Sequence, residues 1–259
     1  MNDAITKSLF DLTGKTALIT GGGGGIGLAC ARALANYGAS ILLTDISEKY
    51  LNEGIYALKQ DDAVVSGICA DVSDPYQTED IINAAKPLGG IDIFINSAAI
   101  TNRKQVLNMT DKEWLDIINT NLNGAFYLGR AVARQMIRQE RGGKIIYIVS
   151  TGAYRASVNF GAYSASKAGV VMLMKTLALE LAPYKICVNA IAPTATETRF
   201  TYDYYLNNPD KKKAVINNHP FGRIAVPEDY MGTAVYLSSA ASDFVTGEMI
   251  VVDGGKTAK

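Results

Sequence analysis

Tyr163 and Lys167 form a pair whose residue types and spacing suit acid-base chemistry. On a helix, residues four positions apart share one face, so the Lys167 ammonium can lie beside the Tyr163 phenol. A free tyrosine has a pKa of about 10, and a neighbouring cation favours the phenolate and lowers that pKa. We therefore expect Tyr163 to exchange protons near neutral pH, with Lys167 lowering its pKa.

A third polar residue, Ser150, ends an apolar, strand-like segment upstream of this pair. Its hydroxyl would hydrogen-bond the same substrate oxygen and hold a carbonyl where a hydride can reach it. The pair alone is weak support for an enzyme, because tyrosine and lysine are common on helix surfaces. The other motifs of the chain must decide between catalysis and an incidental spacing.

Composition favours a single globular domain over residues 1–259. Hydrophobic residues make up 48% of the chain and charged residues 19%, with no long Pro/Ser-rich or charged linker. Lys+Arg and Asp+Glu both count 25, so no net positive charge suggests a nucleic acid or an anionic membrane as partner. The expected partner is a small molecule.

The ends and the rarer residue types exclude further classes. The first fifteen residues are unlike a signal peptide, and no apolar run approaches the roughly twenty residues that span a bilayer, so we expect a cytoplasmic protein. Cys30, Cys69 and Cys187 have no metal-ligand spacing and are expected to be buried free thiols. His219 is the only histidine, which disfavours a metal site and a Ser-His-Asp hydrolase.

Short apolar runs alternate with helical segments, a pattern that predicts a βαβ series. The runs are 15–20, 40–44, 64–70, 91–96, 144–149, 186–191 and 248–252. Helices are expected from about 26 to 37, over 47–60, about 77–86, 111–140, 162–181 and 227–238. Because the strands are nearly continuous in apolar residues, the predicted fold is α/β: a doubly wound parallel sheet with helices on both faces.

Residues 194–226 form the longest stretch without strand character. They contain Tyr202, Tyr204 and Tyr205, whose rings could cover a bound substrate. Long irregular segments in α/β enzymes are often lids, and the alternative is a surface excursion with some helix. We expect a substrate lid here.

A glycine loop follows the first strand and leads into an amphipathic helix. Gly21 to Gly25 and Gly27 allow a tight turn and a close approach to a pyrophosphate at the helix N-terminus. Asp45, at the end of the second strand, can accept hydrogen bonds from ribose hydroxyls. Its alternative role is to cap the helix that begins near Ser47.

Taken together, these motifs resemble the short-chain dehydrogenase/reductase family in its compact form, over essentially the whole chain. The resemblance extends to Asn119-Thr120-Asn121, to Val188-Asn189-Ala190-Ile191-Ala192-Pro193 and to Val252-Asp253-Gly254-Gly255. The opening segment 10–20 is also similar to that of gluconate 5-dehydrogenase-like members. The resemblance implies a Rossmann-type domain and, commonly for the family, a homotetramer.

The resemblance also implies roles for individual residues. Asn121, Ser150, Tyr163 and Lys167 would form a catalytic tetrad, in which Asn121 holds a water that links Lys167 to solvent, or makes internal hydrogen bonds at a helix kink. The implied cofactor contacts are Gly21, Gly25, Ile26, Gly27, Asp45, Asp71, Val72, Asn96, Tyr163, Lys167, Pro193, Thr196 and Thr198. Two departures concern small residues near the cofactor, since Ala99 and Thr194 stand where the family usually has glycine.

The predicted function is an NAD(H)-dependent oxidoreductase that interconverts a secondary alcohol and a ketone, with a sugar acid or polyol as the first candidate substrate. Arg103, Arg155 and Arg199 follow segments expected at the site mouth and could bind an anionic substrate. NAD is expected over NADP because Asp45 would repel a 2′-phosphate and no basic residue stands beside it in sequence. The alternatives are a 3-oxoacyl-thioester reductase and a non-catalytic nucleotide-sensing protein.

Overall fold

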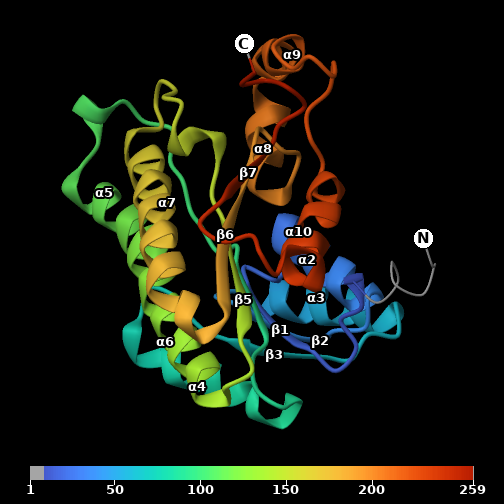
Figure 1. The fold of residues 1–259 in the computed structure, drawn as a ribbon. Helices are drawn as coiled ribbons and strands as arrows, with labels where there is room; N and C mark the ends of the chain where they lie inside the picture. Colours follow the sequence, from blue (N-terminus) through green and yellow to red (C-terminus); the bar gives the residue numbers. More distant parts are fainter. Residues whose placement is uncertain (1–8, 259) are drawn as a thin grey trace.

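The computed structural model describes residues 9–258, which fold around one seven-stranded parallel sheet (Figure 1). The strands lie in the order β3-β2-β1-β4-β5-β6-β7. Their bounds are β1 Thr16–Thr20, β2 Ser40–Asp45, β3 Val65–Cys69, β4 Ile93–Asn96, β5 Gly143–Ile148, β6 Ile186–Pro193 and β7 Met249–Val252. Every predicted strand is present within two residues of its expected ends, and the doubly wound α/β fold is confirmed.

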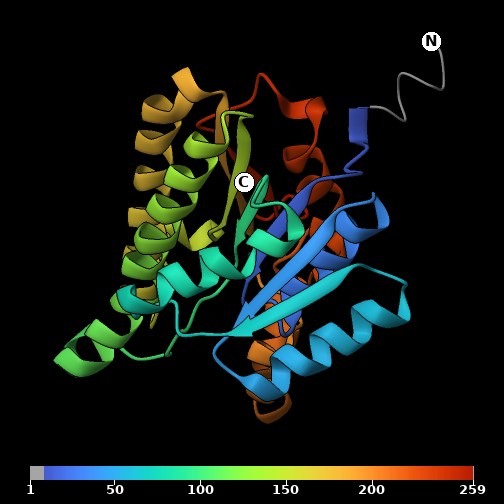
Figure 2. The ribbon, with the colours of Figure 1, turned by 90° about the horizontal axis from the view of Figure 1, so that it is seen from below.

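Helices cover both faces of the sheet, as Figure 2 shows from below. One layer contains α2 (Gly25–Asn36), α3 (Glu48–Gln60) and α10 (Met231–Ser238), and the other contains α4 (Thr78–Ala84), α6 (Gly124–Gln139) and α7 (Gly161–Leu181). Side chains of successive strand residues point to opposite faces of the sheet. Ile19 packs with the first helical layer, whereas Leu18 and Phe94 pack with the second. The continuous apolar strands of the sequence therefore have a physical cause, since both faces are buried.

Two predicted helices differ from those observed. The single helix expected over 111–140 is α5 (Asp111–Ile118), a π-helical turn (Asn119–Asn123) and then α6. The one expected over 227–238 begins as a 3-10 turn, Pro227–Tyr230, before α10. A π turn inserts one residue into the helical repeat, which hydrophobic spacing alone does not reveal.

The cysteine prediction is only partly right. Cys30 is buried, but Cys187 is half-buried and Cys69 is exposed. Cys69 lies on β3, the first strand in the order of the seven-stranded sheet, and an edge strand is flanked by a neighbouring strand on one side only.

The order of the strands reverses between β1 and β4, and this is where ligands bind in open α/β sheets. At their carboxyl ends, the Thr20 hydroxyl donates to Asn96 Oδ1 (3.1 Å) and accepts from the amides of Ser97 (3.0 Å) and Ala98 (3.1 Å). Thr20 thus joins the two strand ends that frame the crevice.

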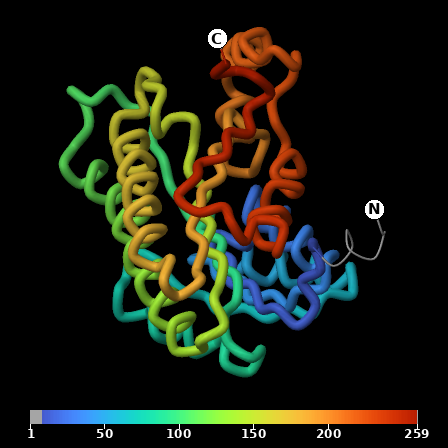
Figure 3. Tube along the Cα trace, in the orientation of Figure 1, coloured from blue at the N-terminus to red at the C-terminus, as the bar shows by residue number. Residues whose placement is uncertain are grey.

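The segment predicted as a lid contains two helices, α8 (Arg199–Asn207) and α9 (Pro209–Asn217). Figure 3 traces this segment from the end of β6 to the same end of the molecule as the C-terminus. The segment therefore stands at the carboxyl ends of the strands.

Candidate active site

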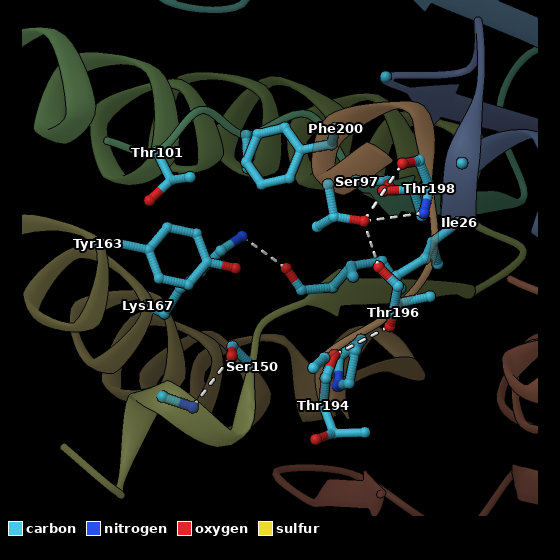
Figure 4. A pocket seen from close by; sticks show the side chains of 18 of the residues that line it. Ile26, Ser97, Thr101, Ser150, Tyr163, Lys167, Thr194, Thr196, Thr198 and Phe200 are labelled. Carbon is cyan, nitrogen blue, oxygen red and sulfur yellow. Dashed lines mark hydrogen bonds between the residues drawn. The ribbon is translucent and has the colours of Figure 1, made fainter. Parts of the chain in front are cut away.

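A cavity of about 660 Å³ opens at the carboxyl ends of the strands. Its walls come from the glycine loop, from the segments after β4 and β5, from α7, and from the segment after β6. In Figure 4, Tyr163, Lys167 and Ser150 lie on one side of this pocket, and Ile26 and Thr198 lie on the other. One cavity therefore joins the expected proton-transfer residues to the expected nucleotide loop.

The glycine loop has backbone geometry that side chains would disturb. Gly21 and Gly25 have φ of +61° and +54°, a region that L residues rarely adopt. A Cβ on Gly23 would lie 2.7 Å from the Tyr50 backbone. Because the first amides of α2 have no partner within the helix, this open cradle fits a pyrophosphate at the helix N-terminus.

Asp45 lines the same cavity at the end of β2. Its carboxylate accepts from the amides of Gly23 (3.1 Å) and Ser47 (3.0 Å). The N-cap of α3 is Ser47, whose hydroxyl accepts from the Tyr50 amide, so Asp45 does not cap that helix. The carboxylate instead ties the glycine loop to the second strand.

Several expected cofactor residues line the cavity and others do not. Those on its wall are Gly21, Gly25, Ile26, Asp45, Tyr163, Lys167, Pro193, Thr196 and Thr198. Those outside it are Gly27, Asp71, Val72 and Asn96.

The four residues outside the wall have contacts that explain their place. A Cβ on Gly27 would lie 2.4 Å from the Gly21 carbonyl, and Asn96 accepts from Thr20. Asp71 accepts from Ser73, and Val72 packs against Gly124. Gly27 and Asn96 therefore support the glycine loop and the strand end beside it, whereas Asp71 contacts the segment that follows β3 and Val72 contacts α6.

Tyr163 and Lys167 lie on α7, as their spacing predicts. Lys167 is 2% exposed, and its Nζ donates to the Ile148 carbonyl (2.8 Å) and lies 5.7 Å from the Tyr163 ring centroid. Burial lowers the pKa of Lys167 to about 8. Lys167 therefore lies beside the Tyr163 phenol as expected, and it is buried.

The direction of the Tyr163 pKa shift is opposite to the one expected from the sequence. Burial raises the pKa of Tyr163, and the Ser150 hydroxyl opposes that rise without overcoming it. Burial removes the phenolate from water and so disfavours it, and the nearby Lys167 does not reverse this effect.

The remaining tetrad residues are held by backbone contacts. Ser150 Oγ accepts from the Gly152 amide (3.0 Å) and faces the cavity. Asn121 lies in the π turn, where its side chain accepts from the Ile100 amide (2.8 Å) and donates to the Ile100 carbonyl (2.9 Å) and Ser166 Oγ (3.1 Å). The internal hydrogen bonds expected of a kink residue are therefore present.

The three arginines have different surroundings. Arg103 lines the cavity, with its guanidinium carbon 3.4 Å from the Tyr204 ring centroid and 5.0 Å from that of Phe160. Arg199 also lines the cavity, but it pairs with Glu53 (2.9 Å) beside the glycine loop. Arg155 lies outside the wall, because it turns away to the C-terminal segment.

The segment after β6 closes the cavity through buried contacts. Thr194 Oγ1 lies 3.0 Å from Nε2 of His219, and Thr196 Oγ1 bonds the Tyr230 hydroxyl (2.6 Å). Among the three tyrosines that the sequence singled out, Tyr205 lines the cavity, Tyr204 stacks on Arg103 and Tyr202 is exposed. Neither Ala99 nor Thr194 has a positive φ, so both replacements are accommodated without left-handed backbone.

Sequence reasoning missed Tyr50, Ser164 and Lys256, which also line the cavity. Tyr50 follows Asp45 closely and Ser164 adjoins Tyr163, so their motifs could have indicated them. Lys256 comes from the C-terminal turn, and only long-range folding brings it to the site.

Two further features are absent from the described part of the chain. Within residues 9–258, no group of three His, Cys, Asp or Glu side chains is arranged to hold a metal ion. Over the same range, no helix is both long and apolar enough to cross a membrane.

Known proteins resemble the chain along nearly its whole length. A family model described as Enoyl-(Acyl carrier protein) reductase matches residues 21–257. The 2-dehydro-3-deoxy-D-gluconate 5-dehydrogenase of Dickeya dadantii is 37% identical, covering 96% of this chain and 98% of that protein. The gluconate 5-dehydrogenase of Gluconobacter oxydans is 35% identical, with 96% and 97% covered.

Solved structures agree. A gluconate 5-dehydrogenase from Burkholderia cenocepacia, determined in complex with NADP and tartrate, is 34% identical with a TM-score of 0.92, and the match covers 98% of this chain and 99% of that one.

Proposed function

Because the chain belongs to the short-chain dehydrogenase/reductase family, we propose that it is an NAD(H)-dependent oxidoreductase that interconverts a secondary alcohol and a ketone. The observation that carries this proposal is the shared cavity, in which Ser150, Tyr163 and Lys167 face the same space as the glycine loop. A nicotinamide cofactor, when bound, supplies the hydride chemistry.

The chain's own residues would manage the proton and the reacting oxygen. Tyr163 removes the hydroxyl proton in oxidation and returns it in reduction, while Ser150 hydrogen-bonds the same oxygen. Lys167, buried and charged below a pKa of about 8, favours the phenolate when the proton leaves. Asn121 supports the helix of this site through its bonds to Ile100 and Ser166, and we propose that it also helps to hold a water near Lys167.

The preference for NAD rests on Asp45. Its carboxylate is fixed by two amides where a ribose would meet the second strand, and a 2′-phosphate there would face that negative charge. A cation, Arg199, also lies beside the glycine loop. Its charge is neutralised by an ion pair with Glu53. The relative from Burkholderia cenocepacia was solved with NADP, so the two cofactors must be compared directly.

We propose a sugar acid as the substrate class, with a polyol as the neutral alternative. The relatives named above are dehydrogenases of sugar acids, and Arg103 lines this chain's cavity with no carboxylate partner within residues 9–258. A 3-oxoacyl-thioester is the second candidate; the description of the matching family model supports it only in naming an acyl group on a carrier protein, because an enoyl group is a carbon-carbon double bond and not a ketone.

Three broader expectations complete the proposal. The chain would act as one domain, with residues 194–226 as a lid over the substrate. It would work as a homotetramer, as the family resemblance implies, and in the cytoplasm. Light scattering of the purified protein would test the assembly. A dimer or monomer would overturn the proposed homotetramer and leave the proposed activity untouched.

A spectrophotometric screen tests the proposed activity. NAD and NADP reduction is followed with sugar acids, polyols, hydroxysteroids and hydroxyacyl thioesters. We expect turnover with NAD and a sugar acid that Tyr163→Phe largely removes. Activity confined to thioesters would favour the second candidate, and cofactor binding without turnover on any substrate would favour a nucleotide-sensing protein.

A further inference from the structure

The turn that follows β7 forms one wall of the cavity. Its backbone is held by Asp253, whose carboxylate accepts from the amides of Gly255 (2.9 Å) and Thr257 (2.8 Å) and from the Thr257 hydroxyl (2.6 Å). Asp253 is buried, so these bonds are largely shielded from water. Figure 1 shows the chain ending beside α9, at the edge of the sheet where the cavity lies.

This turn docks on the segment that follows Ser150. The Tyr154 hydroxyl bonds Thr257 Oγ1 (2.7 Å), and Arg155 Nη1 donates to the Lys256 carbonyl (3.2 Å). These contacts bring Lys256 onto the wall of the cavity, together with Ser150 and Gly152. Arg155, which the sequence suggested as a substrate ligand, thus acts as a support for Lys256.

The charge of Lys256 has no ion-pair partner among residues 9–258. The side chain is half-buried, and burial together with the nearby Arg155 holds the pKa of Lys256 below its ordinary value, while Asp253 opposes that shift. The Asp253 carboxylate is already engaged by its own turn. A partly desolvated ammonium of this kind favours an anion brought by a ligand.

The other residues of the cavity wall supply no free carboxylate to neutralise Lys256. Among the described residues that line the cavity, Asp45 carries the only carboxylate, and it is bound to the Gly23 and Ser47 amides at the cofactor end. Arg103 adds another cation that has no acidic partner among the described residues. The part of the cavity away from the glycine loop is therefore positively charged.

An unsatisfied hydroxyl lies on the same wall. Ser164 Oγ is buried and has no hydrogen-bond partner among residues 9–258. A Cβ on Gly152 would be 3.3 Å from Ser150 Oγ and 3.4 Å from Ser164 Oγ, so both hydroxyls border one small space. Buried polar atoms normally find partners, and a hydroxylated ligand would provide one here.

We propose that Lys256 binds the carboxylate of a polyhydroxy acid substrate, while Ser164 hydrogen-bonds a hydroxyl of the same molecule. The inference rests on the proposed function and names the residue that selects acids over neutral polyols. The substrate's oxidised carbon would lie at Ser150 and Tyr163, and the charged end would lie toward the C-terminal turn.

Gluconate and gluconamide form the matched pair that tests this assignment, because they differ in charge and share the polyol chain. We expect Lys256→Met to lower kcat/KM for gluconate about 10- to 100-fold, mainly through KM, and to change that for gluconamide by less than about threefold. Lys256→Arg should retain most of the preference for the acid. Lys59→Met, at an exposed position of α3 away from the cavity wall, is the control for general loss of surface charge.

Ser164→Ala should lower kcat/KM for both compounds alike, since its partner is a neutral hydroxyl. Equal losses on gluconate and gluconamide in Lys256→Met, or no loss on either, would overturn the role of Lys256 while leaving the oxidoreductase intact. The role of Lys256 would also be overturned if the wild type oxidised polyols but no sugar acid. Failure of the wild type on every alcohol and ketone would reject the proposed function itself.

Discussion

Thr194 Oγ1 and Nε2 of His219 lie 3.0 Å apart, in a contact buried from solvent. Nδ1 of the same ring bonds the Val215 carbonyl (2.7 Å), which can only accept, so in the neutral imidazole Nδ1 carries the proton and Nε2 accepts from the Thr194 hydroxyl. The only histidine of the chain is therefore used to join the strand end at Pro193 to the end of α9. A threonine where the family usually has glycine supplies the donor.

Thr194→Val should destabilise the protein by about 1 to 3 kcal/mol, because it leaves a buried ring nitrogen without a partner. Thr194→Ser, which keeps the hydroxyl, should stay close to the wild type. Urea unfolding at neutral pH measures both. Identical midpoints for the valine and serine variants would show that the contact contributes no stability.

Tyr163→Phe should lower kcat by about 10²- to 10⁴-fold, because it removes the proton donor and leaves the ring in place. The affinity for NADH, measured by its fluorescence, should change by no more than a few fold. Near-normal turnover in this variant would reject Tyr163 as the acid-base group.

Ser150→Ala should lower kcat by about 10²- to 10³-fold if its hydroxyl stabilises the reacting oxygen. Ser150→Thr keeps a hydroxyl and serves as the control. Steady-state kinetics separates the two possible roles, since an effect on KM alone would assign Ser150 to binding of the ground state.

Lys167 should make stability rise with pH above about 8. Its pKa is about 8 in the folded protein and near 10.5 when exposed, so between these values the unfolded chain binds more protons than the native one. Relative to Lys167→Met, the wild type should therefore gain about 2 kcal/mol of unfolding free energy from pH 7 to pH 9.5. Urea titrations of both proteins at the two pH values measure this, and a constant difference would mean that Lys167 keeps an ordinary pKa.

The wild type should prefer NAD over NADP by more than tenfold in kcat/KM. Two unit charges about 4 Å apart repel by about 4 kcal/mol at an effective dielectric near 20, and half of that exceeds a tenfold ratio. Asp45→Asn removes the charge with little change of shape and should reduce the preference. Asp45→Ala with Ile46→Arg should erode it further or reverse it.

Arg199→Met gives the matched control for the cofactor choice, because Arg199 is the cation that the structure places beside the glycine loop. If Glu53 neutralises it, this variant should leave the NAD to NADP ratio unchanged. A wild-type preference for NADP would show that Asp45 does not exclude the 2′-phosphate.

Features that depend on neighbours in sequence could be predicted from the sequence. The parallel sheet follows from apolar runs between helices, and its strands lie within two residues of their predicted ends. Tyr163 and Lys167 share a helix face because they are four residues apart. The glycine loop lies against Asp45 because a short helix and a parallel strand connect them.

The tertiary structure decided what depends on burial and on distant segments. The direction of the Tyr163 pKa shift follows from desolvation, which a neighbouring lysine in the sequence does not reveal. The C-terminal turn packs against the segment after Ser150, so Lys256 lies on the cavity wall and Arg155 lies outside it. Local spacing in the sequence specifies which residues share a helix or strand. The packing of helices and strands against one another determines which charged side chains are buried and which side chains face the same cavity.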